Sequence, residues 1–521
     1  MKNSFIFRLM IFFIAGLMTA AAQEAAPNWG TDVNVKPESG KYYKNVRTAV
    51  AYDGTVYLGR LSADAPAGPY MKWEVFKSTD GGRNWDDFIG GTLGASDYSA
   101  FDMITAGENA SDFRLYVARA YVNDTETKLR ATNYTADGTS TALSFDDYSV
   151  TPYSSSRGFV SLSWATDSRK PNYVSSPYSI SLAASVSTPG SDKVICWTTD
   201  DPTLNFIEKE LYSTLNFVGD VDATIGVDDF NSDFGRLGVV FMIKSGSADE
   251  NGKLYTRFVY PDNGDEASYS GPYLVGEDDY IYSSPTIAMS QVVGGTSGPG
   301  VDDIRTLIAY SKQTASGNKD VAFSYSDNMI LNEPSFTAST TIDGDSGDQM
   351  NPHMIFDPLF NNFLLTYNKA SAKTLPYMLK GLNTTLADSF FVFKDNFRDA
   401  TSSPAVPIQP RVEMSNPESN AVFAWNDDYK SMFDAEYFMG TAEVETTDLL
   451  VYPNPVSDIL NIKSQKGIET VELTNMLGQI VIRSKELNDQ KLNVSSLAPG
   501  VYVLKVVFGN GNTQVVKVMK R

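Results

Sequence analysis

The chain has 521 residues, and 63 Asp and Glu against 42 Lys and Arg give it a formal net charge of −21 at pH 7. This acidity, without any run of Lys or Arg, argues against nucleic acid as a partner. The one cysteine, Cys196, excludes an intrachain disulfide and a thiolate metal cluster, and the one histidine, His353, excludes a multi-histidine metal site. We expect Cys196, in the apolar run KVICWTT, to be a core residue.

The first segment has the pattern of an export signal. Lys2 and Arg8 supply positive charge, an apolar run follows over 9–21, and small residues lead to a predicted cleavage after Ala22. The alternative is an uncleaved anchor helix, but the run is shorter than the ~20 residues that a membrane span needs. No later stretch is long and apolar enough to cross a membrane. We therefore expect a secreted or cell-surface protein, with 1–22 as a signal peptide and no transmembrane anchor.

The rest of the chain has the composition of strands joined by polar turns, and no sustained helical periodicity is present. Five strand-like runs end at a turn that carries an aspartate, at intervals of 57, 63, 62 and 65 residues. These are WEVFKSTDGG, LRATNYTADG, KVICWTTDDP, TRFVYPDNG and VAFSYSDNM, with Asp80, Asp137, Asp200, Asp262 and Asp327. Two weaker copies lie near Asn383 and Glu443. The sequence therefore contains a repeated unit.

A second element repeats in phase with the first, as two strands around an Asp-, Asn- or Gly-rich turn. Its copies begin at Asn45, Ser284, Asn351 and Gln409. Each unit then holds at least three antiparallel strands, which predicts an all-β fold with a β-propeller over 28–444. Seven blades are the simplest count, and six or eight stay possible. Because the last unit lacks room for an outer strand, we expect Trp29–Val35 to supply it and close the ring.

The stretch KSTDGGRNW contains Ser78, Asp80, Gly82 and Trp85 at the spacing S-x-D-x-G-x-x-W. We interpret it as a turn, because an Asp can accept backbone N–H bonds and glycine permits positive φ. Trp85 would then pack between the strands as an apolar plug. The pattern resembles the Asp-box, or bacterial-neuraminidase repeat, of sialidases and other propellers, where the box lies away from the central cleft.

The resemblance raises the question of a sialidase-like site, which would need three arginines, a Tyr nucleophile with a Glu partner, and an Asp acid/base. Arg47 occupies the first arginine position, although Thr48-Ala49 replaces the family's Ile-Pro. Asp64 lies roughly where the acid would fall, and Arg411 has the register of Arg47 in its own unit. An arginine pair could hold a carboxylate bidentately. Alternatively, both arginines cap strand ends or pair with nearby acids.

Thr286 and His353 share the register of Arg47 and Arg411, and all four are candidates for binding at a central channel. Only Arg236 and Arg305 are available as a third arginine, and spacing identifies no Tyr/Glu pair. Catalytic residues are therefore unassigned, with Arg47, Asp64 and Arg411 as candidates.

Two acidic segments are candidates for Ca²⁺. IDGDSGDQMN contains Asp343, Asp345 and Asp348, and GDVDATIGVDD contains Asp220, Asp222, Asp228 and Asp229. No Glu stands at the twelfth position of an EF-hand loop, so solvated acidic turns are the alternative. We expect no other cofactor.

From residue 449 the composition changes, with nine Lys and Arg against five Asp and Glu. Short alternating strands separated by Pro-Asn-Pro, Leu-Gly-Gln and Pro-Gly turns predict a small Ig-like β-sandwich over 445–521. YPNP at 452–455, NMLGQ at 475–479 and LAPGVY at 497–502 resemble the type A C-terminal sorting domain of the type IX secretion system. The resemblance implies the secretion machinery as a partner and passage across the outer membrane.

Three functions are compatible with the sequence. The leading hypothesis is an extracellular propeller that binds a glycan or another macromolecule. The alternatives are a sialidase-like glycoside hydrolase and a non-catalytic structural surface protein. A hydrolase needs converging carboxylate, Tyr/Glu and Arg groups in the central cleft, whereas a binder needs only aromatic and polar groups there.

Overall fold

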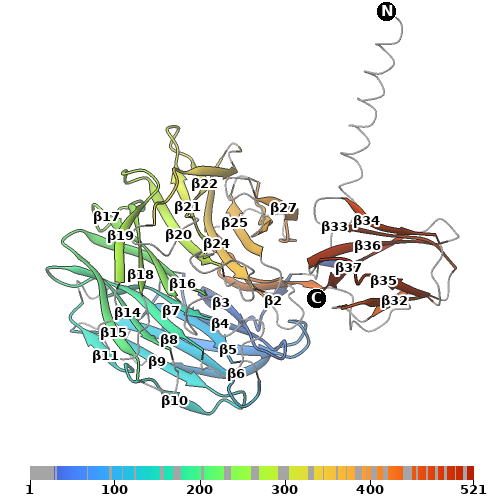
Figure 1. Cartoon of the computed structure of the whole chain (residues 1–521). Coiled ribbons are helices and arrows are strands. Elements are labelled where there is room, and N and C mark those ends of the chain that lie inside the picture. The colour runs from blue at the N-terminus through green and yellow to red at the C-terminus, as the bar shows by residue number, and fades with distance from the viewer. Residues whose placement is uncertain are drawn as a thin grey trace, which may run out of the picture. The chain divides into compact units, whose positions relative to one another are not determined.

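The structure is a computed structural model of the whole chain (Figure 1). It describes residues 28–29, 32–66, 68–92, 97–107, 109–122, 125–152, 158–167, 178–200, 205–227, 236–259, 269–290, 304–326, 334–343, 345, 347–358, 362–370, 372–381, 390–394, 396–399, 408–414, 421–437, 449–452, 456–464, 467–475, 479–485, 490–498, 500–508 and 513–520. The predicted signal peptide lies outside these residues, as do Asp228 and Asp229. The chain divides into two compact units, Thr31–Ala435 and Met1–Gly30 with Glu436–Arg521.

The described residues form strands and no α-helix, which confirms the all-β prediction. Six antiparallel sheets follow one another along the larger unit, each in simple chain order. Sheet 1 contains β3 (Tyr42–Val50), β4 (Val56–Ala63), β5 (Lys72–Ser78) and β6 (Asp86–Thr92). Sheet 2 contains β7 (Asp97–Ala106), β8 (Arg114–Val122), β9 (Thr127–Tyr134), β10 (Ser140–Ala142) and β11 (Tyr148–Val150). Sheet 3 contains β12 (Phe159–Thr166), β13 (Ile180–Val186), β14 (Asp192–Thr199) and β15 (Ile207–Thr214).

Sheet 4 contains β16 (Phe217–Gly226), β17 (Arg236–Lys244), β18 (Lys253–Val259) and β19 (Tyr269–Val275). Sheet 5 contains β20 (Tyr282–Met289), β21 (Thr306–Gln313), β22 (Lys319–Ser326) and β23 (Thr340–Asp343). Sheet 6 contains β24 (Gln349–Asp357), β25 (Asn362–Lys369), β26 (Tyr377–Gly381) and β27 (Phe391–Lys394). Asp80, Asp137 and Asp200 directly follow the third strands β5, β9 and β14, whereas Asp262 and Asp327 lie outside the described residues.

Sheet 7 combines β28 (Arg411–Met414), β29 (Ala421–Asp427) and β30 (Lys430–Tyr437) with β2 (Val33–Asn34), which pairs with β30. Beyond the end of the larger unit, β1 (Asn28–Trp29) pairs with Glu436 and Tyr437, the last residues of β30. The buried Arg60 guanidinium holds the N-terminal segment in place, because it donates to the carbonyls of Val35 (2.6 Å) and Lys36 (2.9 Å) and to Ser431 Oγ (2.6 Å). The N-terminal segment therefore lies beside β30 as an outer strand, where the sequence places it.

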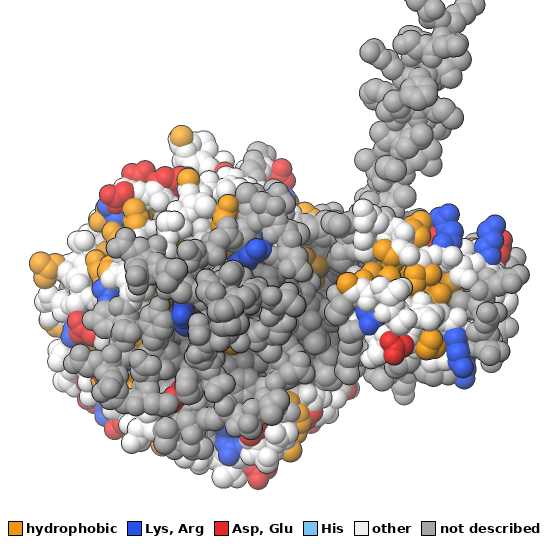
Figure 2. All heavy atoms as spheres, in the orientation of Figure 1, with side chains coloured by type: hydrophobic (Ala, Val, Ile, Leu, Met, Phe, Trp, Pro, Cys, Tyr) orange, Lys and Arg blue, Asp and Glu red, His pale blue; other side chains and the backbone are white. Residues whose placement is uncertain are grey.

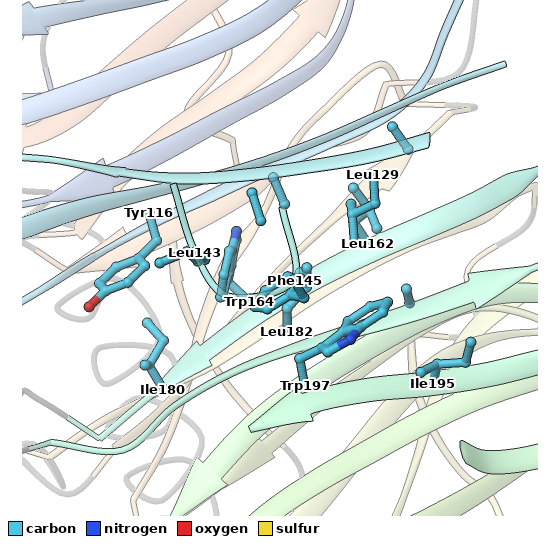
Figure 3. Packing of buried hydrophobic residues seen from close by; sticks show 14 of the residues in the cluster. Tyr116, Leu129, Leu143, Phe145, Leu162, Trp164, Ile180, Leu182, Ile195 and Trp197 are labelled. Atoms are coloured by element: carbon cyan, nitrogen blue, oxygen red, sulfur yellow. The ribbon is translucent and has the colours of Figure 1, made fainter. Parts of the chain in front are cut away.

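The first strands β3, β7, β12, β16, β20, β24 and β28 contact one another in succession, and β28 contacts β3. Apolar clusters fill the space between successive sheets. Between sheets 2 and 3, Phe145 stacks on Trp197 with ring centroids 4.9 Å apart, and Trp164 lies beside Tyr116 at 5.6 Å (Figure 3). Second strands such as β4 and β13 are buried along their whole length, because a sheet packs on each face.

Cys196 is buried between sheets 3 and 4, as expected, and burial raises the pKa of its thiol to about 12.

The C-terminal unit has two sheets around one apolar cluster. The first contains β31 (Leu449–Tyr452), β32 (Ile459–Ser464) and β35 (Lys491–Asn493). The second has the order β34 (Ile480–Ser484), β33 (Ile468–Asn475), β36 (Gly500–Phe508) and β37 (Thr513–Lys520).

Candidate functional site

A cavity of about 380 Å³ lies where the first strands of the seven sheets meet. Residues of β3, β7, β12, β16, β20, β24 and β28 all contribute to its wall. This volume is near the lower end of the ~300–1,000 Å³ that ligand pockets occupy. Arg47, His353 and Arg411, three of the candidate residues, line the cavity.

A shared register relates one residue on each first strand. On six of the seven strands a β-bulge precedes this position and resets the pairing with the second strand. Asn45, Ser284 and Asn351 each lie in such a bulge with positive φ, two residues before the shared position. The seven residues in this register are Arg47, Asp102, Ser163, Asp222, Thr286, His353 and Arg411.

Five of these seven side chains accept a backbone N–H from the next sheet. The donor in every case is the residue that follows the shared position on that sheet. The bonds are Trp164 N to Asp102 Oδ2 (2.8 Å), Ala223 N to Ser163 Oγ (3.1 Å), Ile287 N to Asp222 Oδ2 (2.9 Å), Met354 N to Thr286 Oγ1 (3.1 Å) and Val412 N to His353 Nδ1 (3.2 Å). The first strands have no partner strand on this side, so these side chains satisfy inward-pointing N–H groups and join successive sheets.

Asp222 is the most heavily bonded member of this series. Besides Ile287 N–H, its carboxylate accepts the hydroxyls of Ser163 and Thr286, each at 2.8 Å. Three donors around one carboxylate leave it little capacity for a ligand. Thr286 is a candidate for ligand binding by its sequence register, but it is buried and does not line the cavity. Its hydroxyl instead joins neighbouring sheets.

Arg47 and Asp102 form an ion pair across sheets 1 and 2, with Nε and Oδ1 separated by 2.8 Å. Both side chains are largely buried, with exposed fractions of 14% and 13%. Burial raises the pKa of the Asp102 carboxyl, and the adjacent Arg47 charge and the Trp164 N–H oppose that rise. Arg47 therefore pairs with a nearby acid, which is the alternative to ligand binding given in the sequence analysis.

Arg411 differs from Arg47 because its Nε is buried without a hydrogen-bond partner. Burial, followed by repulsion from Arg47, lowers the pKa of Arg411 to about 10, against the attraction of Asp222, Asp102 and Asp220. The guanidinium is still protonated at neutral pH, so the wall carries a cation with an unused Nε donor.

His353 is a hydrogen-bond donor toward the cavity and not a base. Its Nδ1 accepts Val412 N–H, which places the proton of the neutral ring on Nε2. Burial and the charges of Arg411 and Arg47 lower the pKa of His353 well below its ordinary value. The ring is therefore neutral at physiological pH.

Asp220 lines the cavity two residues before Asp222, and no hydrogen bond to its carboxylate occurs within the described residues. The surrounding protein partly strips water from the carboxylate and raises its pKa, against the opposing charges of Lys244, Arg411 and Arg47. Of the residues considered above, Arg411 and His353 thus offer donors on sheets 7 and 6, and Asp220 offers an acceptor on sheet 4.

The candidate residues for catalysis are not all brought together in this cavity. Asp64 lies outside the lining, directly after β4, with 73% of its side chain exposed, and pairs with Lys41. Arg236 and Arg305 do not line the cavity and supply no third arginine. Among the described lining residues there is also no tyrosine that could act as a nucleophile.

The acidic turn that is a candidate for Ca²⁺ is in contact with a lysine. Lys369 Nζ lies 2.8 Å from both Asp343 Oδ2 and Asp345 Oδ2, and Asp348 Oδ1 accepts Lys319 N–H at 2.9 Å. Across the described part of the chain, no three His, Cys, Asp or Glu side chains are arranged to hold a metal ion.

The turn at 78–85 has the contacts expected of a structural element. Asn84 N–H donates to Asp80 Oδ1 (2.9 Å), Gly82 N–H to Ser78 Oγ (2.8 Å) and Trp85 Nε1–H to the Gly82 carbonyl (2.8 Å). Gly82 has a φ of +92°, and a Cβ there would lie 2.0 Å from the Phe433 ring. None of these residues lines the cavity.

Sequence reasoning missed Asp102 and considered Asp222 only as a calcium ligand. Alignment of the first strands on Arg47 would have placed both, since the shared positions recur 55 to 67 residues apart. No Asn or Ser with positive φ marks the bulges before Asp102 and Asp222, so these two positions have no local signal of the kind found before Arg47, Thr286 and His353.

Comparison with solved structures gives distant likenesses. An alpha-L-arabinanase of Penicillium chrysogenum complexed with arabinobiose is 9% identical, covers 78% of this chain and 98% of its own, and has a TM-score of 0.41. A Dyadobacter fermentans protein of unknown function is 10% identical over 79% of this chain and 98% of its own, with a TM-score of 0.41. A Trypanosoma rangeli sialidase in complex with 2,3-difluorosialic acid is 10% identical over 94% and 88%, with a TM-score of 0.40.

Beta-agarase D of Zobellia galactanivorans is 38% identical over 74 residues, which are 14% of this chain and 15% of that protein. The chain therefore spans about 15% of the length of this curated relative. No helix within the described residues has the length and hydropathy of a membrane span.

Residues 450–521 match the family described as secretion system C-terminal sorting domain. This match implies interaction with the secretion machinery and export to the cell surface or the extracellular space.

Proposed function

We propose that the larger unit is a seven-bladed β-propeller over 28–444, followed by the sorting domain over 445–521 and preceded by a signal peptide over 1–22. Seven successive sheets, mutual contact of their first strands and five repeats of the same inter-sheet hydrogen bond support this architecture. The turn at 78–85 is then an Asp-box on the first blade.

The exported propeller binds a glycan in the central cavity, through an anionic carboxylate or sulfate group at Arg411. The buried Arg411 Nε, which has no hydrogen-bond partner, is the observation that carries this function. A buried donor without an acceptor is unfavourable, so an anionic oxygen from a ligand would relieve an existing cost. Arg47 adds positive potential, His353 offers Nε2–H, and Asp220 is available to ligand hydroxyls.

Glycoside hydrolysis is supported less well by the same wall. The reaction ordinarily uses two carboxyl groups about 5–10 Å apart. Asp102 is bound to Arg47 and Trp164 N–H, Asp222 is bound to three donors, and Glu413 Oε1 accepts Met414 N–H. Among the described wall residues, Asp220 is therefore the one carboxylate without a hydrogen bond. The polar cavity also argues against a purely structural protein, for which no such concave site is expected.

The test is a glycan panel with sialylated, uronic-acid-bearing, sulfated and neutral sugars, scored for retention and cleavage by the purified protein. We expect retention of anionic sugars without cleavage, and a loss of about 100-fold in affinity for Arg411→Met, since a charged hydrogen-bonded pair is worth about 3 kcal/mol. The matched control is Arg130→Met, a half-exposed arginine that is paired with Asp146 and does not line the cavity. Equal loss in both variants, or retention of neutral sugars alone, would contradict the proposal.

A further inference from the structure

The C-terminal unit carries more than its share of exposed apolar side chains. Seven large hydrophobic residues in the described part of the chain are exposed, and Ile459, Ile480 and Val481 of this unit are three of them. Figure 2 shows hydrophobic side chains gathered on this unit, with Lys and Arg nearby. Such gatherings mark interaction sites when they persist on a folded surface.

Ile480 and Val481 lie next to each other on β34, an outer strand of the four-stranded sheet, with 47% and 37% of their surface exposed. Successive residues of a regular strand point to opposite faces. Here the pairing with β33 shifts between Thr474↔Ile480 and Leu473↔Ile482, so Val481 lies in a bulge. Ile482 packs on the core, while both residues before it stay exposed.

Within the described residues, β34 itself also lacks the usual protection of an outer strand. Edge strands are commonly guarded by lysine or proline, and β34 contains neither, although Lys485 directly follows it. Its one charge, Arg483, forms an ion pair with Glu472 on the neighbouring strand at 2.8 Å. The opposite outer strand, β37, contains Lys517 and Lys520.

We propose that β34 docks against a protein of the type IX secretion machinery by strand addition, with Ile480 and Val481 entering apolar pockets of that protein. The family match identifies the occupant, because a sorting domain must be recognised by this machinery. An open strand edge supplies main-chain hydrogen bonds for affinity, and alternate side chains supply specificity. The inference is independent of the proposed cavity ligand.

The test measures export of the full-length chain from cells that have the type IX system. For Ile480→Lys combined with Val481→Lys, we expect the extracellular fraction to fall at least about ten-fold, with folded protein retained in the periplasm. The matched control is Ile207→Lys, which changes an exposed apolar residue (38%) on β15, an outer strand of the larger unit, and should export normally.

Normal export of the folded double-lysine variant would overturn the proposal, and so would an equal loss in the Ile207→Lys control. If the double-lysine variant is protease-sensitive, Ile480→Thr combined with Val481→Thr decides, because threonine keeps β propensity while removing apolar surface. We expect a several-fold loss of export for this milder variant, and normal export would overturn the proposal. Glycan retention by the purified variants should stay unchanged, which separates this test from that of the cavity.

Discussion

The wall of the cavity has two regions that use the same structural position differently. On sheets 2 to 6 the residue in the shared register accepts an N–H from the next sheet. On sheets 7 and 1 this residue is an arginine, whose side chain contains no hydrogen-bond acceptor. The five acceptors join sheets, whereas the Nε donor of Arg411 is not used by the protein. A polar residue in a cavity is therefore evidence for a ligand only after its bonds within the protein are counted.

The largest loss of stability is expected when one of the five acceptor side chains is removed. Asp222→Ala would leave the hydroxyls of Ser163 and Thr286 and the Ile287 N–H without their acceptor. We expect the free energy of unfolding, measured by urea denaturation, to fall by about 4 kcal/mol, because each buried unpaired group costs about 1–3 kcal/mol.

Asp220→Ala is the matched control on the same strand. Asp220 has no such hydrogen bonds, so its removal should change the free energy of unfolding by less than about 1 kcal/mol. Equal losses in the two variants would show that the inter-sheet bonds do not distinguish the two aspartates.

The sequence predicted the elements that have local patterns. Strand alternation, the turn at 78–85 and the motifs of 450–521 are all short-range signals, and the all-β class and the sorting domain were accordingly predicted correctly. Arg47, His353 and Arg411 were placed together because the two-strand repeat kept their register.

Contacts between residues far apart in the chain could not be predicted from the sequence. Lys369 enters the acidic turn from a strand that begins 14 residues after Asp348, so the spacing of acids could not reveal it. Asp102 belongs to the wall through a bulge and a bond to Trp164, 62 residues away. Asp64 looked suitable by position along the chain alone and lies outside the cavity.

The second prediction tests Arg47, the arginine that has a partner. Arg47→Met keeps most of the apolar stem and leaves the Asp102 carboxylate buried without its cation. We expect a loss of about 3 kcal/mol in the free energy of unfolding. Arg47→Met combined with Asp102→Asn should recover much of this loss, and no recovery would mean that the ion pair is not its cause.

The third prediction concerns the pH dependence of His353. Its pKa is lower in the folded chain than in the unfolded chain, so the unfolded state binds more protons below the ordinary value of about 6.5 and stability falls as the pH falls. His353→Asn keeps an acceptor for Val412 N–H without titrating. Between pH 7 and pH 5 it should lose less stability than the parent chain, by at most about 2 kcal/mol. Parallel pH profiles of the two proteins would contradict the neutral ring.

The smallest change in stability is expected for Arg411→Met. Removal of the guanidinium breaks no hydrogen bond of its Nε, ends the desolvation of its charge and relieves the repulsion from Arg47, which together outweigh the lost attraction to Asp222, Asp102 and Asp220. The free energy of unfolding should therefore stay the same or rise by about 1 kcal/mol, in contrast to the loss for Arg47→Met. If denaturation instead shows a loss as large as that of Arg47→Met, both arginines serve the fold and neither is left for a ligand. A stable Arg411→Met protein that no longer retains anionic glycans would show that the sheet 7 arginine is kept for binding, since the fold does not need it.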